Sequence, residues 1–153
     1  VTAAKSTDNY ETYGVLYNWP AVMTEGICPS GWHIPSDEEW QTMEMSLGMS
    51  QSEAAFEGHR GSPVGDYMKS TSGWNSGGNG SNSSGFTGLP GGYRYSGGFS
   101  GAPVNGYAGL GYWWSASESG STSWSRMLYG GFDKVGRDAD FRSYGFSARC
   151  VRD

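Results

Sequence analysis

The feature that most constrains this chain is the way glycines alternate with large apolar side chains. Between Thr71 and Gly111 there are 14 glycines, interrupted at intervals by apolar anchors. Glycine lets the backbone turn sharply and approach its neighbours closely, whereas an aromatic ring buries a large area and fixes a loop to a core. The pattern therefore predicts a long ordered loop region and not a flexible linker. The anchors are Trp74, Phe86, Leu89, Tyr93, Tyr95, Phe99 and Tyr107.

The composition excludes several classes of protein. Aromatic residues make up 15% of the chain and charged residues 16%, whereas disordered chains are poor in aromatics and rich in charge. No apolar run approaches the roughly 18–20 residues of a membrane span, so we expect no membrane insertion. The net charge of −5 and the lack of a Lys/Arg run argue against nucleic acid as a partner.

The length of 153 residues predicts one domain. Residues 1–11 are polar and are expected to be an arm or linker remnant, and residues 12–153 to form the single domain. Residue 1 opens no charged-then-apolar signal pattern, which is typical of a processed or excised domain.

The clearest local signal predicts a helix over residues 37–47. Ser36 and Glu39 have the spacing of a capping box, and acidic residues fill the first turn. Gly48 ends the pattern. The apolar residues Trp40, Met43 and Leu47 fall on one face of this helix.

Weaker helical patterns cover residues 51–58 and 66–69. The segment around Trp32, between two prolines, is expected to be an extended loop that buries the ring. Short runs of aromatic and β-branched residues predict strands. They cover residues 13–19, 112–117, 122–129 and 144–151.

Cys28 and Cys150 are the two cysteines of the chain and lie far apart in it. In a composition typical of exported bacterial surface proteins, they predict a disulfide and an oxidising compartment. The bridge closes a loop of about 120 residues, for which the chain-entropy model gives roughly 4–5 kcal/mol as an upper figure. Two buried thiols are the alternative, and a metal site lacks partners because His33 and His59 show no ligand spacing.

Five segments follow one another in a fixed order: Tyr13–Trp19, Cys28–Trp40, Leu89–Arg94, Gly111–Ala116 and Gly145–Val151. Together they closely resemble the Fibrobacter succinogenes major paralogous domain family, which is similar to the C-type-lectin-like scaffold of formylglycine-generating-enzyme relatives. The resemblance implies an α+β, C-type-lectin-like fold with one or two helices, long Gly-rich loops and a small antiparallel sheet whose terminal strands lie close together. It also matches Cys28 and Cys150 to the cysteine positions of the family.

The resemblance does not bring an enzymatic activity with it. The formylglycine-generating relatives depend on a cysteine pair near the C-terminal end of their domain, where this chain has only Cys150. The Glu-Pro-Asn and Trp-Asn-Asp signatures of calcium-dependent lectins are missing. We therefore expect no catalytic residues, no enzyme activity and no cofactor, and leave a structural calcium ion open.

A narrower resemblance concerns residues 112–152. Members of the family often serve as variable proteins of diversity-generating retroelements, in which mutagenised adenines turn Asn codons (AAC) into other residues around a fixed framework. Arg126, Leu128, Val135 and Arg137 occupy framework places here, and Lys134 departs from the pattern. An ordinary divergent loop is the alternative. The places where such repeats are Asn-rich hold residues reachable from AAC, namely Tyr129, Gly130, Gly131, Phe132, Asp133, Gly136, Asp138, Ala139, Asp140, Phe141 and Ser143.

Residues 117–143 are the expected binding face. They mix small residues, aromatics and opposed charges, as antibody loops do, and exposed phenylalanines there are best explained as contact residues. Residues 126–153 carry 6 basic and 4 acidic groups (net +2), against 4 and 11 (net −7) in residues 1–125, so we expect a surface polarised toward the C-terminal segment. The candidate ligand-binding residues are Trp114, Arg126, Tyr129, Gly130, Phe132, Asp133, Gly136, Arg137, Asp138, Asp140, Phe141 and Ser143.

The expected function is that of a non-catalytic adhesin or receptor-type domain, exported to the bacterial cell surface or the extracellular space. Its partner would be a protein or glycan ligand on another cell or surface. Two alternatives remain: a structural or adhesive tip module of a surface fibre or pilus, and a cryptic formylglycine-generating-type enzyme.

Overall fold

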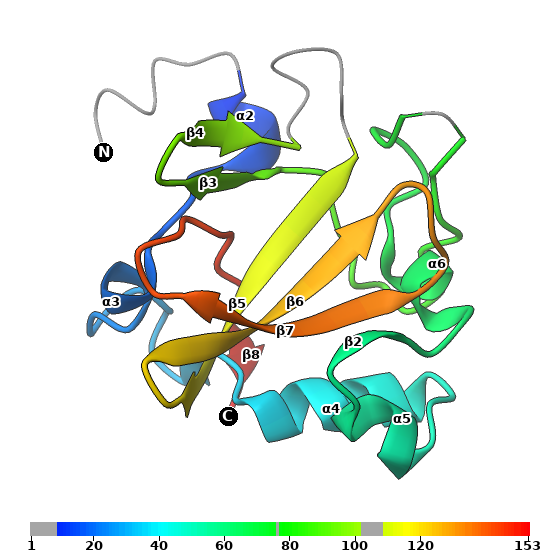
Figure 1. Ribbon diagram of the computed structural model, residues 1–153, viewed down its shortest axis with the longest axis horizontal. Coiled ribbons are helices and arrows are strands. Elements are labelled where there is room, and N and C mark those ends of the chain that lie inside the picture. Colours follow the sequence, from blue (N-terminus) through cyan, green and yellow to red (C-terminus); the bar gives the residue numbers. More distant parts are fainter. Residues whose placement is uncertain (1–8, 76, 102–108) are drawn as a thin grey trace.

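A four-stranded antiparallel sheet with the strand order β2-β7-β6-β5 organises the molecule (Figure 1). The computed structural model describes residues 9–75, 77–101 and 109–153. Two further ribbons, β1–β8 and β3–β4, accompany the central sheet. The strands are β1 (Trp32–His33), β2 (Gly58–Arg60), β3 (Tyr93–Tyr95), β4 (Gly98–Ser100), β5 (Leu110–Ser119), β6 (Thr122–Tyr129), β7 (Val135–Phe141) and β8 (Val151–Arg152).

Five helices occur in the described ranges, which is more than the one or two expected. They are α2 (Tyr10–Tyr13), α3 (Trp19–Val22), α4 (Asp37–Ser46), α5 (Gln51–Ala55) and α6 (Val64–Met68). Only α4 is longer than five residues, and α4 and α5 lie together along one side of the sheet (Figure 1). The fold class is therefore α+β, as predicted. Among the described residues, no helix combines the length and hydropathy of a membrane span.

The predicted boundary between residues 11 and 12 falls inside α2. Residues 1–8, which make up most of the predicted arm, lie outside the described residues.

Helix α4 confirms the strongest local prediction. The Ser36 hydroxyl accepts a hydrogen bond from the Glu39 amide (3.1 Å), and the Glu39 carboxylate accepts one from the Ser36 amide (2.8 Å). Trp40 is buried in a core with the inner side chains of the sheet. Gly48 follows the helix with a φ of +117°, a conformation that glycine adopts without strain.

Two predicted strands are corrected by the structure. Residues 13–19 contribute one isolated bridge, at Tyr17, because Asn18 caps α3 and Pro20 lies in its first turn. Residues 144–151 make isolated bridges to three different segments, so that only β8 is a strand there. Strand β7 was not predicted, and it lies within residues 117–143, which were expected to form the binding face. Trp32, expected to be buried, is 45% exposed.

The Cys28–Cys150 disulfide is present, as predicted. It joins the segment before β1 to the segment before β8, and these two strands pair with each other. The terminal strands therefore lie close together. Both sulfurs border an aromatic cluster whose buried members are Val22, Ile34, Trp114 and Phe146.

The glycine-rich region is anchored in part as predicted. Trp74 is buried, and its indole N–H donates to the Gly88 carbonyl, while Phe86 packs edge-on against Trp40 and Trp113. Phe99 is 64% exposed and anchors nothing. Tyr107 and the rest of residues 102–108 lie outside the described residues.

The register of β6 against β7 assigns every side chain to one of two faces. Residues directly opposite each other in an antiparallel pair share a face, and successive residues alternate. The inner face, toward α4, holds Arg126 opposite Arg137 and Leu128 opposite Val135. The outer face holds Ser123 opposite Asp140, Ser125 opposite Asp138 and Met127 opposite Gly136.

Candidate ligand-binding site

Arg126 and Arg137, two of the predicted contact residues, are committed to ion pairs under the inner face. Arg126 donates to Asp37 (2.8 Å) and Glu44 (2.7 Å), and Arg137 donates to Asp37 (2.6 Å). Arg60 pairs with Glu44 from the other side. All five groups are buried, so neither arginine lies on a contact surface, and two of the six basic groups of residues 126–153 are paired inside the protein.

Trp114 and Gly136 are also removed from the predicted contact surface. Trp114 is fully buried, packs at a tilt against Phe146 with a centroid separation of 4.2 Å, and donates its indole N–H to the Tyr17 carbonyl. Gly136 is buried where an added Cβ would lie 3.1 Å from the Met127 Cβ. These positions build the frame of the site and do not face solvent.

Asp138 and Asp140 form a partly exposed acidic row on the outer face of β7. The Ser125 hydroxyl donates to Asp140 (2.7 Å). Burial raises the pKa of the Asp140 carboxyl, and the Asp138 charge adds to that shift against the opposing Ser125 bond. Burial, together with these two carboxylates, also raises the pKa of the Tyr112 phenol above its usual range.

The hairpin between β6 and β7 gathers another group of predicted residues. Phe132 is 46% exposed, and its ring packs edge-on against Tyr129 (5.0 Å between centroids) and His59 (5.3 Å). Asp133 accepts a hydrogen bond from the Ser62 hydroxyl (2.6 Å). The turn carries Gly130 and Gly131 between these side chains.

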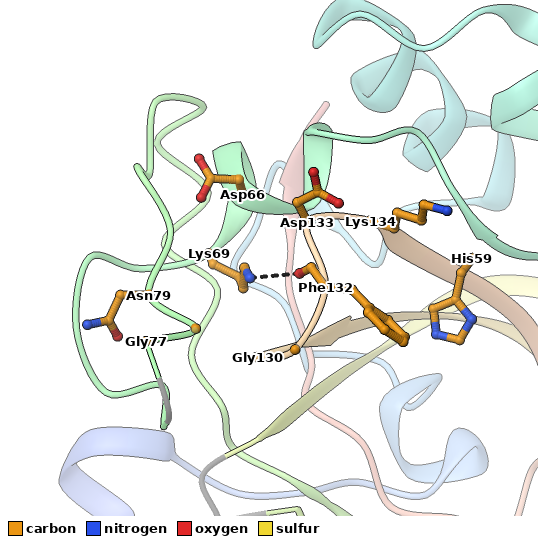
Figure 2. Close-up of a pocket in the computed structure, with 11 residues that line it drawn as sticks. His59, Asp66, Lys69, Gly77, Asn79, Gly130, Phe132, Asp133 and Lys134 are labelled. Carbon is orange, nitrogen blue, oxygen red and sulfur yellow. Dashed lines mark hydrogen bonds between the residues drawn. The ribbon is translucent and has the colours of Figure 1, made fainter.

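A pocket of about 540 Å³ opens beside this hairpin (Figure 2). The hairpin forms one wall, α6 with the residue after it forms the second, and a glycine turn forms the third. The lining residues are His59, Asp66, Lys69, Gly77, Gly78, Asn79, Gly130, Gly131, Phe132, Asp133 and Lys134.

Lys69 holds the pocket wall together. Its side chain is buried, and its ammonium group donates to the Phe132 carbonyl (2.8 Å, dashed in Figure 2) and to the Tyr129 carbonyl (3.4 Å). Burial lowers the pKa of this amine, against the opposing charges of Asp66 and Asp133. The lysine therefore fixes the position of the hairpin from beneath.

The sequence predicted contact residues in the segment that forms the hairpin, but it pointed to no residue of the opposite pocket wall. Asp66, Lys69 and Asn79 lie more than 50 residues before Phe132 in the chain, and no local periodicity links them to it. The one available signal was the Gly-Gly-Asn turn itself, because such turns let a backbone approach a ligand closely.

The last predicted residues lie at the other end of β7. Phe141 is 62% exposed and contacts Tyr144, and Ser143 is exposed nearby. The seven-residue strand separates them from the hairpin by about 20 Å at the usual rise per residue. The predicted face is therefore divided into a hairpin end, an acidic row and a far end.

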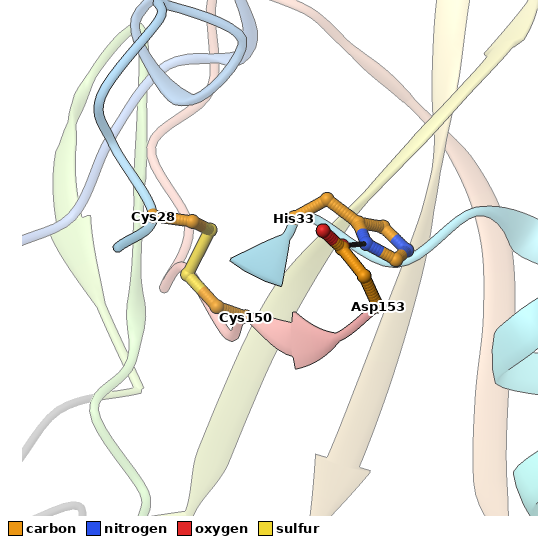
Figure 3. The surroundings of a disulfide bond; sticks show 4 residues. All are labelled: Cys28, His33, Cys150 and Asp153. Atoms are coloured by element: carbon orange, nitrogen blue, oxygen red, sulfur yellow. Dashed lines mark hydrogen bonds and ion pairs between the residues drawn. A yellow bond between two sulfur atoms is a disulfide. The ribbon is translucent and has the colours of Figure 1, made fainter. Parts of the chain in front are cut away.

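His33 is held by hydrogen bonds to two carboxylates. Its ring bonds to Asp153 (2.6 Å) and Glu39 (2.9 Å), beside the disulfide (Figure 3). These two hydrogen bonds raise the pKa of the imidazole. A second hollow of about 420 Å³ lies against this ring and the exposed Trp32. In the described part of the chain, no group of three or more His, Cys, Asp or Glu side chains could hold a metal ion.

A protein-family model identifies what the chain is similar to. Residues 1–152 match the model described as the Fibrobacter succinogenes major domain. Searches of curated proteins and of solved structures find no significant match. Since the family model covers nearly every residue, the chain belongs to the Fibrobacter succinogenes major domain family.

Proposed function

We propose that this chain is a non-catalytic ligand-binding domain on a C-type-lectin-like scaffold, exported to the bacterial surface or the extracellular space. Its ligand would be a protein or glycan on another cell or surface. The observation that carries the proposal is that buried and exposed side chains serve different places along residues 126–143. Framework side chains point inward and are buried, whereas Phe132 and Phe141 stay exposed without an element of the described chain covering them.

The alternation of inward and outward side chains along β7 supports diversification by a retroelement. Val135 and Arg137, both at framework places, lie on the inner face, and Asp138 and Asp140, both at variable places, lie on the outer face. Substitutions at outward positions leave the core unchanged, so such positions tolerate many residues. Two variable places are exceptions, because Ala139 lies opposite Trp124 and Phe141 opposite Thr122, both in the inner-face register.

The disulfide supports a binding role over the enzymatic alternative. Formylglycine-generating relatives depend on reactive cysteines, and here the two cysteines of the chain are bonded to each other. An oxidase of that type would need a thiol that this arrangement does not offer.

The test is a binding screen of the disulfide-bonded protein against glycans and host surface proteins. We expect a ligand whose binding is lost in Phe132→Ala, Asp138→Ala or Phe141→Ala, with the thermal midpoint nearly unchanged. Thiol titration of the native protein and turnover assays on thiol peptides run beside the screen. A titrating thiol with turnover would replace the binding role by an enzymatic one.

The coding DNA tests the retroelement separately. We expect a nearby template repeat with AAC codons at the variable positions, together with a reverse transcriptase gene. If neither lies nearby, residues 129–143 are an ordinary divergent segment, and the binding role then stands on the screen alone.

A further inference from the structure

We infer that the pocket beside the β6–β7 hairpin binds a neutral saccharide. The inference rests on the proposed function and adds the chemical class of one ligand. It follows from three properties of the pocket: a rigid wall, a balanced set of charges, and polar groups without protein partners beside an exposed ring.

The pocket wall is fixed by close backbone contacts. The Gly65 amide donates to the Asp133 carbonyl (2.8 Å), and a Cβ at Gly65 would overlap the Lys134 backbone. A Cβ at Gly78 would likewise overlap the backbone of Gly130. With Lys69 holding the hairpin carbonyls, the walls stand in place before a ligand arrives, which lowers the entropy lost on binding.

The charges that line the pocket cancel in number. Asp66 and Asp133 supply two carboxylates, and Lys69 and Lys134 supply two ammonium groups. An anionic ligand would meet the carboxylates, and a cationic ligand would meet the ammonium groups, each with a desolvation cost. A neutral ligand that both donates and accepts hydrogen bonds avoids both costs.

Several polar atoms of the lining residues have no partner among the described residues. Neither oxygen of the Asp66 carboxylate has a hydrogen bond or ion pair there, and Asp133 uses only Oδ2, toward Ser62. Asn79 uses its Oδ1 to accept from the Trp74 amide, which leaves its Nδ2 as a donor. Together these residues bring acceptors and a donor to the lining of one cavity, as a ligand with several hydroxyl groups requires.

Phe132 supplies the apolar part of the site. Its ring is 46% exposed and is held by edge contacts with Tyr129 and His59. The apolar C–H face of a sugar ring can lie on such a ring while its hydroxyls reach the carboxylates. A volume of about 540 Å³ lies within the range of small-molecule sites.

The experiment is an amide-resolved NMR titration of the full, disulfide-bonded chain. The probes are the neutral sugars glucose, galactose, mannose, N-acetylglucosamine, lactose and cellobiose, with glucuronate and glucosamine as anionic and cationic counterparts of glucose. We expect at least one neutral sugar to shift the amides of Gly77, Gly78, Gly130 and Gly131 in a saturable manner. The charged counterparts should bind several-fold more weakly.

Variants assign the shifts to named groups. Asp66→Ala should weaken binding roughly tenfold, because it removes acceptors that would bond the sugar, whereas Glu11→Ala, an exposed change on α2, should leave it unchanged. Phe132→Ala should abolish saturable binding and Phe132→Tyr should retain it. Thermal melts establish that each variant is folded.

The inference is overturned if no neutral sugar binds, if only a charged sugar binds, or if Asp66→Ala binds as tightly as the wild type. Failure of sugar binding in this pocket is distinguishable from failure of the proposed ligand-binding function. A ligand found in the binding screen and lost in Asp138→Ala or Phe141→Ala would uphold the binding role without a sugar in this pocket.

Discussion

The two faces of the central sheet are held by different interactions, although they share the same strands. The inner face buries three arginines and two carboxylates against α4. The outer face carries an aromatic cluster and the disulfide near β5, and an acidic row that is partly open to solvent on β7. Neighbouring residues of β7 therefore lie in different environments: one is buried in ion pairs and the next is partly open to solvent.

The largest expected effect comes from breaking the inner network. Arg126→Met removes the only side chain that bonds both Asp37 and Glu44 in the described structure, and leaves carboxylates buried with fewer partners. We expect a loss of about 3–5 kcal/mol in the free energy of unfolding, measured by urea denaturation with the disulfide intact. Arg142→Met is the control: its pair with Glu118 is partly exposed, and its guanidinium also donates to the carbonyls of Gly120 and Thr122, so we expect a smaller loss of about 1–2 kcal/mol.

Equal losses in the two arginine variants would contradict this picture. They would mean that the inner network contributes no more to stability than a surface ion pair.

The next effect concerns the disulfide. Replacing Cys28 and Cys150 together by alanine removes a crosslink between residues 122 apart. We expect a loss of about 2–5 kcal/mol, since the crosslink restricts the unfolded chain. Urea denaturation of the double variant measures it, and the wild type under reducing conditions should match. A double variant as stable as the oxidised wild type would show that the aromatic cluster alone holds this side.

The pH dependence of stability should have opposite signs for two aspartates, one on each face. Burial alone would raise the pKa of Asp37, but the bonds from Arg137 and Arg126 outweigh it and hold that pKa below its usual value of 3.8. Burial raises the pKa of Asp140. The contribution of Asp37 to the free energy of unfolding is present at pH values above its usual pKa and is lost as the pH falls through the lowered pKa. The contribution of Asp140 is present at low pH and is lost as the pH rises through the raised pKa.

Asp37→Asn and Asp140→Asn separate these contributions. From pH 3 to pH 7, unfolding free energies should show Asp37→Asn losing stability relative to the wild type as pH rises. Asp140→Asn should gain over the same range, because Asn keeps an acceptor for Ser125 and carries no charge. Parallel curves for the two variants would contradict the assignment of opposite shifts.

The contrast between the faces also explains what the sequence could predict. Helix α4 was predictable because Ser36 and Glu39 act within one turn. Strand β7 was not predictable, because a charged residue such as Arg137 is typical of a surface and its partner Asp37 lies 100 residues away. The disulfide followed from composition and cysteine count, which need no geometry.

The candidate site was predictable only on one wall for a similar reason. Phe132 and Asp133 lie in a segment of distinctive composition, but Lys69 and Asp66 reach them only through the packing of α6 against the hairpin. Trp114 was misassigned because alternation along a strand does not reveal which face is covered. Phe146, from the far end of the chain, covers it.

The smallest expected effect is on the partly or largely exposed residues of β7. Asp138→Ala and Phe141→Ala should change the free energy of unfolding by no more than about 0.5 kcal/mol, because Phe141 is 62% exposed and the Asp138 side chain has no hydrogen bond in the described structure. Phe146→Ala, a fully buried ring of the same type, should cost about 3–5 kcal/mol. If Phe141→Ala lowered the free energy of unfolding as much as Phe146→Ala, the far end of β7 would belong to the core and not to the contact surface.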